Sequence, residues 1–227
     1  MKQKFTILFD LDGTLVDTAP DLMLAHNHVM KKFGYPTKST EDIRNLVGKG
    51  AGALIGRSIW GQAKKEFSKV LDAKIKDEMV KEFVNFYGKN IVNESTLVTG
   101  VKDFLIWCKE QNISMAVCTN KQEHLSNDLL KKIGIYDFFE YVAGHNTFEY
   151  CKPDPRHITT IIEILDGDIN KSLMIGDSET DANAAKAAEI PVILLENGYT
   201  EKNSDEIYHN HLVKDFINIE KIVSKYL

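Results

Sequence analysis

The 227-residue sequence is poor in cysteine and contains no long hydrophobic run. Its three cysteines are odd in number and lack the C-x-x-C spacing, which excludes a disulfide framework and a zinc cluster. The apolar run Phe5–Phe9 that precedes the first acidic residue is too short for a signal peptide. No stretch approaches the roughly 20 apolar residues of a membrane span. We therefore expect a cytoplasmic protein without a membrane partner.

Positive charge is also scarce, because 28 lysines and arginines face 33 aspartates and glutamates and give a net charge of -5. Nucleic acids and anionic membranes bind through a basic surface, so this balance argues against both as partners. A small molecule is the expected partner instead. If that molecule is anionic, the positive charge that binds it must be local: a metal ion, a few lysines and backbone amides. The sequence leaves open whether the protein is a monomer or a homodimer.

Short apolar runs alternate with amphipathic stretches along most of the chain. The runs that predict strands are Phe5–Phe9, Ile113–Cys118, Tyr141–Ala143, Leu173–Ile175 and Pro191–Leu195. Their apolar residues are continuous rather than alternating, which is typical of strands buried on both faces of a parallel sheet. The helix-period stretches between them are Val101–Gln111, His124–Ile133, Asp154–Leu165 and Thr180–Ala188. This alternation predicts an α/β fold with a doubly wound parallel sheet.

The region from about Pro20 to Asn93 differs, because it has no strand-like run and repeats apolar residues at helical spacing. An insert directly after the first strand lies above the carboxyl ends of the strands, where open α/β sheets bind their ligands. We therefore predict a core domain formed by residues 1–16 and 96–227, with an all-helical cap domain formed by residues 17–95.

Two pairs of acidic residues follow predicted strands. Asp10 and Asp12 come directly after the first strand, with Gly13 to let the chain turn, and Asp177 and Asp181 follow the run Leu173–Ile175. Each pair alone could be a polar turn. Together they form a set of hard oxygen ligands without histidine, and this set favours magnesium.

Two further polar segments fall at the same predicted edge of the sheet. Thr119 and Asn120 follow a second strand, where a hydroxyl and amides that open a helix can hold a phosphate oxygen or simply cap the helix. Lys152 precedes Pro153 and Pro155, whose rings stiffen the turn that begins the next helix and fix where the lysine points.

In this order the four features resemble the motifs of the haloacid dehalogenase superfamily of phosphatases. These motifs are a strand-end D-x-D-G-T, a serine or threonine after a second strand, a lysine, and G-D-x-x-x-D, and the resemblance covers essentially the whole chain. It implies a magnesium-dependent phosphomonoester hydrolase. Asp10 would be the nucleophile that forms an aspartyl-phosphate, because a carboxylate nucleophile divides one difficult displacement into two easier steps. Asp12 would protonate the leaving oxygen in the first step and accept a proton from the attacking water in the second.

The resemblance also implies roles for the other motif residues. Thr119 and the amide of Asn120 would hold phosphoryl oxygens, while Lys152 would neutralise charge on the phosphate and on the nucleophile. Magnesium would be bound by Asp10, the backbone carbonyl of Asp12 and Asp177, and Asp181 would position these ligands.

The cap segment carries the information on the substrate. The stretch Phe9–Leu22 is similar to the opening of phosphoglycolate phosphatases, Leu46–Ile59 resembles their cap segment V-G-x-G-A-x-x-L-x-x-R, and Gly198-Tyr199 is similar to their glycine-tyrosine turn. This implies 2-phosphoglycolate or a similar small phosphorylated carboxylate. The cap residues expected to bind the carboxylate through amides and positive charge are Gly48, Lys49, Gly50 and Arg57. Alternatively, they form a tight turn with solvated side chains.

Other enzymes share the core motifs and stay open as alternatives. These are a pyrophosphatase, a nucleotide or sugar phosphatase, and a sugar-phosphate mutase, which is an isomerase. The sequence also departs from the phosphoglycolate phosphatase pattern at two points. Val98–Val101 lacks the usual proline, and Glu189 stands where a glycine usually precedes Ile-Pro.

Overall fold

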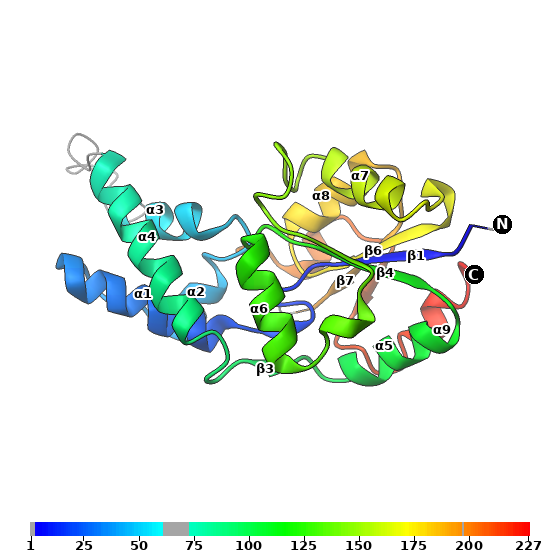
Figure 1. Cartoon of the computed structure of the whole chain (residues 1–227), viewed down its shortest axis with the longest axis horizontal. Helices are drawn as coiled ribbons and strands as arrows, with labels where there is room; N and C mark the ends of the chain where they lie inside the picture. Colours follow the sequence, from blue (N-terminus) through cyan, green and yellow to red (C-terminus); the bar gives the residue numbers. More distant parts are fainter. Residues whose placement is uncertain (1–2, 61–72, 197) are drawn as a thin grey trace.

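A computed structural model of the chain describes residues 3–60, 73–196 and 198–227. It shows two lobes: a layered α/β core that contains both ends of the chain, and a smaller helical lobe beside the carboxyl end of the central strand (Figure 1).

The core is built on a six-stranded parallel sheet with the strand order β5-β4-β1-β6-β7-β8. The strands are β1 (Thr6–Phe9), β4 (Ser114–Cys118), β5 (Tyr141–Ala143), β6 (Ser172–Gly176), β7 (Val192–Leu195) and β8 (His211–Val213). The predicted parallel sheet is confirmed, and each of the five predicted strands agrees within one residue at either end. The edge strand β8 was not predicted, because it has three half-buried residues and forms no continuous apolar run.

Helices cover both faces of the sheet, as a doubly wound fold requires. Successive side chains of β1 point to opposite faces, so Ile7 belongs to the apolar cluster that contains Leu129 of α6, and Leu8 belongs to the cluster that contains Ile161 of α7. The helices of the core are α5 (Val101–Glu110), α6 (Glu123–Ile133), α7 (Arg156–Ile164), α8 (Glu179–Ala187) and α9 (Glu220–Val223).

The strand order reverses next to β1. From β1 the chain adds β4 and β5 on one side, and then returns to add β6, β7 and β8 on the other. The crevice at such a switch point is where open α/β sheets bind ligands. The loops that follow β1, β4 and β6 therefore meet at one edge of the sheet.

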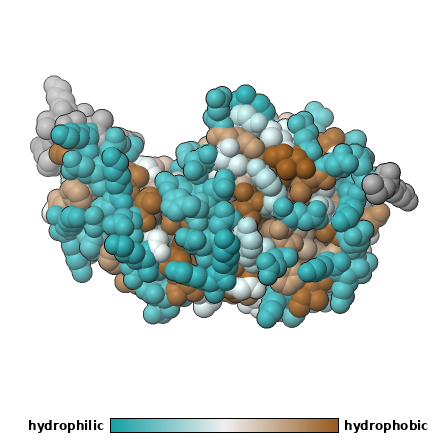
Figure 2. Space-filling model, in the orientation of Figure 1, coloured by the Kyte–Doolittle hydropathy of each residue, from teal (hydrophilic) through white to brown (hydrophobic). Residues whose placement is uncertain are grey.

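The helical lobe lies between residues 19 and 89, and each element described there is a helix, as predicted. These helices are α1 (Ala19–Phe33), α2 (Thr40–Arg44), α3 (Ala51–Trp60) and α4 (Ala73–Lys89). Helix α1 has Pro20 in its first turn and ends at Gly34, whose φ of 78° closes the helix without steric cost. The outward faces of α1 and α4 are mostly hydrophilic (Figure 2), and no helix among the described residues is long and apolar enough to cross a membrane.

Two short strands join the lobes. The strand β2 (Val16–Asp17) pairs with the antiparallel strand β3 (Thr96–Leu97), so the chain leaves and re-enters the core at the same place. The carboxylate of Asp21 in α1 accepts hydrogen bonds from the backbone N–H groups of residues 93–95, which ties the two crossings together. This strand pair lies at the predicted domain boundaries, and the division itself stays a prediction.

Candidate active site

The loop after β1 places Asp10 at the centre of the carboxyl edge of the sheet, where only 6% of the residue is exposed. Gly13 turns the chain with a φ of 84°, and a Cβ at this position would collide with the carboxylate of Asp177. The Thr14 hydroxyl donates a hydrogen bond of 2.9 Å to the same carboxylate. The first acidic loop is therefore shaped around an acid from the loop after β6.

Three buried carboxylates gather at this edge. Asp10, Asp177 and Asp181 each offer an oxygen within 4.8 Å of the others. The Lys152 ammonium lies 2.9 Å from Asp10 and 2.6 Å from Asp181. Three carboxylates against one ammonium leave a formal charge of -2 in a buried place, which is costly unless a cation is bound. The donor set and its charge fit a divalent cation that prefers oxygen ligands.

The pKa values show the same shortage of positive charge. Burial raises the pKa of Asp10 to about 6; Lys152 opposes this rise and Asp181 adds to it. Burial, together with the charges of Asp181 and Asp10, holds the pKa of Asp177 well above its ordinary value. Burial alone would lower the pKa of Lys152, but the Asp10 and Asp181 carboxylates outweigh it and raise this pKa. Shifts of this size at a cleft are typical of functional sites.

Asp181 orients the loop after β6. One of its oxygens accepts hydrogen bonds from the backbone N–H groups of Asp177 and Ser178 and from the Ser178 hydroxyl. Its other oxygen accepts a hydrogen bond of 2.6 Å from Lys152. Asp181 thus holds both an acid and the lysine of the cluster in place.

Asp12 lies apart from the three-acid group. Its carboxylate accepts a hydrogen bond of 2.7 Å from the Thr18 hydroxyl. It also forms an ion pair with Lys121, whose Nζ lies 2.9 Å from one carboxylate oxygen and 3.2 Å from the other. The side chain of Asp12 is thus beside the cluster rather than in it, and only its backbone carbonyl was predicted as a metal ligand.

The segment after β4 connects the core with the cap. Thr119 is buried at the end of the strand. The side-chain amide of Asn120 donates one hydrogen bond of 2.9 Å to the carbonyl of Lys152 and another of 3.1 Å to the carbonyl of Gly48 in the cap. Asn120 therefore fixes the lysine backbone and the cap loop relative to each other.

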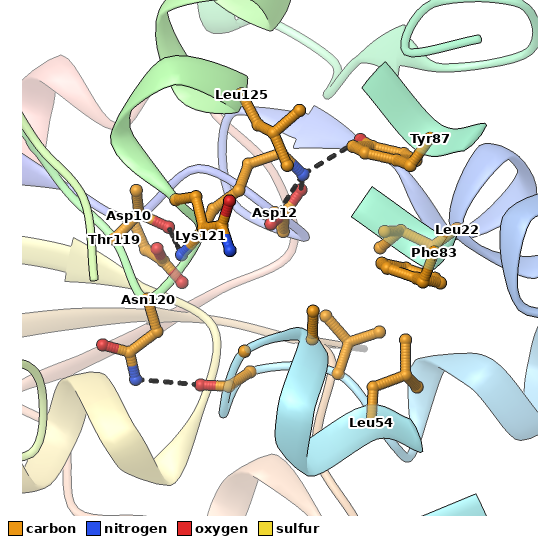
Figure 3. A pocket seen from close by; sticks show the side chains of 15 residues that line it. Asp10, Asp12, Leu22, Leu54, Phe83, Tyr87, Thr119, Asn120, Lys121 and Leu125 are labelled. Atoms are coloured by element: carbon orange, nitrogen blue, oxygen red, sulfur yellow. Dashed lines mark hydrogen bonds and ion pairs between the residues drawn. The ribbon is translucent and has the colours of Figure 1, made fainter. Parts of the chain in front are cut away.

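Of these residues, Asp10, Asp12, Thr119 and Asn120 line a small cavity of about 50 Å³ between the lobes (Figure 3). The core lines it mostly with polar and charged groups, whereas the cap lines it almost entirely with carbon. The core residues are Asp10, Asp12, Thr119, Asn120, Lys121, Gln122 and Leu125. The cap residues are Leu22, Val47, Gly48, Gly50, Ala51, Leu54, Phe83 and Tyr87.

The structure brings only part of the predicted cap segment to this cavity. Gly48 and Gly50 line it, but Lys49 and Arg57 line a separate cavity beside the loop after β6. The Arg57 guanidinium donates to the carbonyls of Asn45 and Leu46 and pairs with Glu201 of the core. The role of these two cations in substrate binding stays a prediction, and the structure places both at the cavity that also contains Ser178 and Tyr199.

Among the cavity residues that were not predicted as site residues, Lys121 and Tyr87 are hydrogen-bonded to each other. Lys121 directly follows the Thr119-Asn120 pair, and its place in that motif was the signal that could have identified it. Tyr87 lies in the region that repeats apolar residues at helical spacing, and this pattern predicts only its place on a helix face. Its hydroxyl nevertheless accepts a hydrogen bond of 2.9 Å from Lys121.

The glycine-tyrosine turn after β7 contacts the acidic cluster and the joint between the lobes. The Tyr199 backbone N–H donates to Asp177 at 2.6 Å, and its hydroxyl donates to Asp17 of β2 at 2.6 Å. The hydroxyl also accepts the N–H of Ala19, where α1 begins. A side chain at Gly198 would collide with Asp177.

A parallel α/β core with an acidic strand edge and a helical cap defines a class of hydrolases, and the comparisons agree. The model of the haloacid dehalogenase-like hydrolase family matches residues 7–195. The chain belongs to this family.

Named relatives are similar over nearly the whole chain. Phosphoglycolate phosphatase of Mesorhizobium japonicum is 37% identical over 92% of this chain and 90% of its own length. Phosphoglycolate phosphatase of Caulobacter vibrioides is 37% identical over 95% of this chain and 89% of its own. The crystal structure of a predicted phosphoglycolate phosphatase from Haemophilus somnus is 31% identical and superposes with a TM-score of 0.88 over 98% of this chain and 99% of that one. The resemblance inferred from the sequence is confirmed.

Proposed function

We propose that this hydrolase is a magnesium-dependent phosphomonoesterase that works through an aspartyl-phosphate on Asp10. The observation that carries the proposal is the buried cluster of three carboxylates with one lysine at the polar side of the cavity. Magnesium would be held by Asp10, Asp177 and the backbone carbonyl of Asp12, with Asp181 holding these groups in position. When bound, it would supply positive charge to the phosphoryl oxygens.

In the first step the Asp10 carboxylate attacks phosphorus, a phosphorus–oxygen bond forms, and the bond to the ester oxygen breaks. Asp12 donates its proton to the leaving oxygen, which departs as an alcohol. The Thr119 hydroxyl and the Asn120 backbone amide would donate hydrogen bonds to the phosphoryl oxygens, and the Lys152 ammonium offsets their charge. Fixed donors of this kind stabilise the charge that develops in the transition state.

In the second step water attacks the phosphorus of the aspartyl-phosphate and the bond to Asp10 breaks. The Asp12 carboxylate, now unprotonated, takes the proton of that water, and inorganic phosphate leaves. One residue can serve both steps because each step restores the protonation state that the other requires. The cap over the cavity limits the entry of other water.

For the substrate, we propose a small phosphorylated metabolite that carries a carboxylate, with 2-phosphoglycolate as the specific compound. The named relatives support this proposal, as do the small volume of the cavity and the resemblance of Leu46–Ile59 to their cap segment. We also propose that the enzyme acts in the cytoplasm, and that nucleic acids and membranes are not its partners.

A panel of phosphate esters, assayed with and without magnesium, tests the proposal. We expect 2-phosphoglycolate to be hydrolysed fastest, and EDTA to abolish phosphate release. Faster hydrolysis of pyrophosphate or of a nucleotide would overturn the substrate and leave the chemistry intact. Isomerised hexose phosphate without free phosphate would identify a mutase instead.

A further inference from the structure

Lys121 and Tyr87 meet across the cavity from opposite lobes (Figure 3). Lys121 follows β4 in the core and Tyr87 belongs to α4 of the cap, and its hydroxyl lies 2.9 Å from the lysine Nζ. The ammonium also lies 4.3 Å from the centre of the tyrosine ring, within the range of a cation–π contact. Both residues line the same cavity as Asp10.

Lys121 already donates to Asp12 and to Tyr87, so the unused hydrogen-bonding capacity of this pair lies in the tyrosine hydroxyl. An ammonium group only donates, so the Tyr87 hydroxyl is the acceptor in its bond with Lys121. Its own proton finds no acceptor among the residues that the structure describes. The tyrosine is only 1% exposed, and a buried hydroxyl normally has a partner for its proton. A ligand in the cavity can supply that acceptor.

The rest of the cap wall offers little to an anion. The side chains of Leu22, Leu54 and Phe83 are apolar, and Arg57 is directed elsewhere. Within the described part of the chain, Lys121 is the one cationic side chain that lines this cavity. An anionic group at the far end of a substrate therefore meets a cationic side chain of this cavity only at Lys121, whose ammonium it shares with the Asp12 carboxylate.

We propose that Lys121 and Tyr87 bind the carboxylate of the substrate, an inference that rests on the proposed phosphatase function. The ammonium supplies charge and the tyrosine hydroxyl supplies a second donor. Apolar walls around the pair strengthen both interactions, because they exclude water. A substrate without the carboxylate leaves these buried groups unmatched, and it is selected against for this reason. The pair also makes the anion a link between core and cap.

The test compares 2-phosphoglycolate with ethyl phosphate, which has no carboxylate. The Tyr87→Phe variant removes one hydroxyl and keeps the ring. We expect the ratio of kcat/KM for 2-phosphoglycolate to that for ethyl phosphate to fall about tenfold, the effect of losing one hydrogen bond to a charged group. Tyr226→Phe is the matched control, because its hydroxyl is hydrogen-bonded to His211 outside the cavity. Its ratio should equal that of the wild type.

Lys121→Met gives a second measurement, with thermal melting used to verify that each variant is folded. The ratio of kcat/KM for 2-phosphoglycolate to that for ethyl phosphate should fall further than in Tyr87→Phe. Glycolate, which retains the carboxylate, should inhibit both variants more weakly than it inhibits the wild type. Unaltered ratios in both variants, or an equal fall in Tyr226→Phe, would overturn the carboxylate site alone. A wild-type enzyme that hydrolyses neither ester would overturn the phosphatase function and this inference with it.

Discussion

The two walls of the cavity differ in chemistry. On the core side, acids, a lysine and a threonine follow neighbouring parallel strands and are held by many short hydrogen bonds. On the cap side, glycines and apolar side chains face the same space, and Tyr87 brings a polar atom to it. Under the proposed mechanism, the core wall would act on the phosphate group that all candidate esters share. The cap wall is the part that can distinguish one ester from another.

The difference also extends to how each wall is held. The core acids are fixed by the strand order and by mutual contacts, so that a change in one disturbs the others. The cap reaches the core through a few polar contacts, such as Asn120 with Gly48 and Arg57 with Glu201. We therefore expect core substitutions to reduce the rate on every substrate, and cap substitutions to alter the choice among substrates.

The largest effect is expected at Asp10. Asp10→Asn removes the attacking carboxylate, so phosphate release should fall by at least about 10⁴-fold on all esters alike. The variant should melt no lower than the wild type, because it removes one of several buried like charges. Residual activity above one per cent of wild type would place the nucleophile elsewhere.

The next effect concerns magnesium and pH. The pKa of Asp10 rises from 3.8 to about 6 on folding, so the metal-free native state binds protons that the unfolded state does not. The contribution of Asp10 protonation to the free energy of unfolding is therefore lost as the pH rises through about 6. Magnesium, if it is held by the charged carboxylates as proposed, would compete with those protons. The rise in melting temperature caused by magnesium should be larger at pH 7.5 than at pH 5, and an equal rise would exclude Asp10 as a ligand.

A smaller effect on catalysis is expected from the cap wall. Leu54 is 3% exposed, and Leu54→Ala should reduce the free energy of unfolding by about 2–5 kcal/mol. The enlarged cavity should raise KM for 2-phosphoglycolate. It should also lower the ratio of kcat/KM for 2-phosphoglycolate to that for bulkier esters, while the magnesium requirement is kept. Denaturant unfolding and a substrate panel measure the two parts. A loss of rate that is equal for all esters would contradict the division of labour between the walls.

The smallest effect is expected at Arg57. Its guanidinium faces Glu201 outside the cavity. Ion pairs at such positions contribute about 1 kcal/mol or less, so Arg57→Ala should change kcat/KM by about fivefold at most. A loss of a hundredfold, specific to 2-phosphoglycolate, would support the sequence-based prediction that this residue binds the substrate.

The core could be predicted from the sequence in more detail than the cap. Parallel strands end at a common edge, so locating Asp10, Thr119 and Asp177 after apolar runs was enough to predict that they meet. The direction of Arg57 depends on how two lobes pack, and no local pattern reports it. Tyr87 illustrates the same limit, because its hydroxyl meets Lys121 only through the packing of the cap against the core.

The strand pair β2–β3 has a consequence for the history of such enzymes. Because the chain leaves and re-enters the core at adjacent residues, the whole helical lobe is attached as a side branch on the sheet. Lengthening, shortening or exchanging that branch leaves the path of the core chain unchanged. New specificities can therefore arise by replacing one contiguous stretch of the gene, while the reaction it serves is inherited intact.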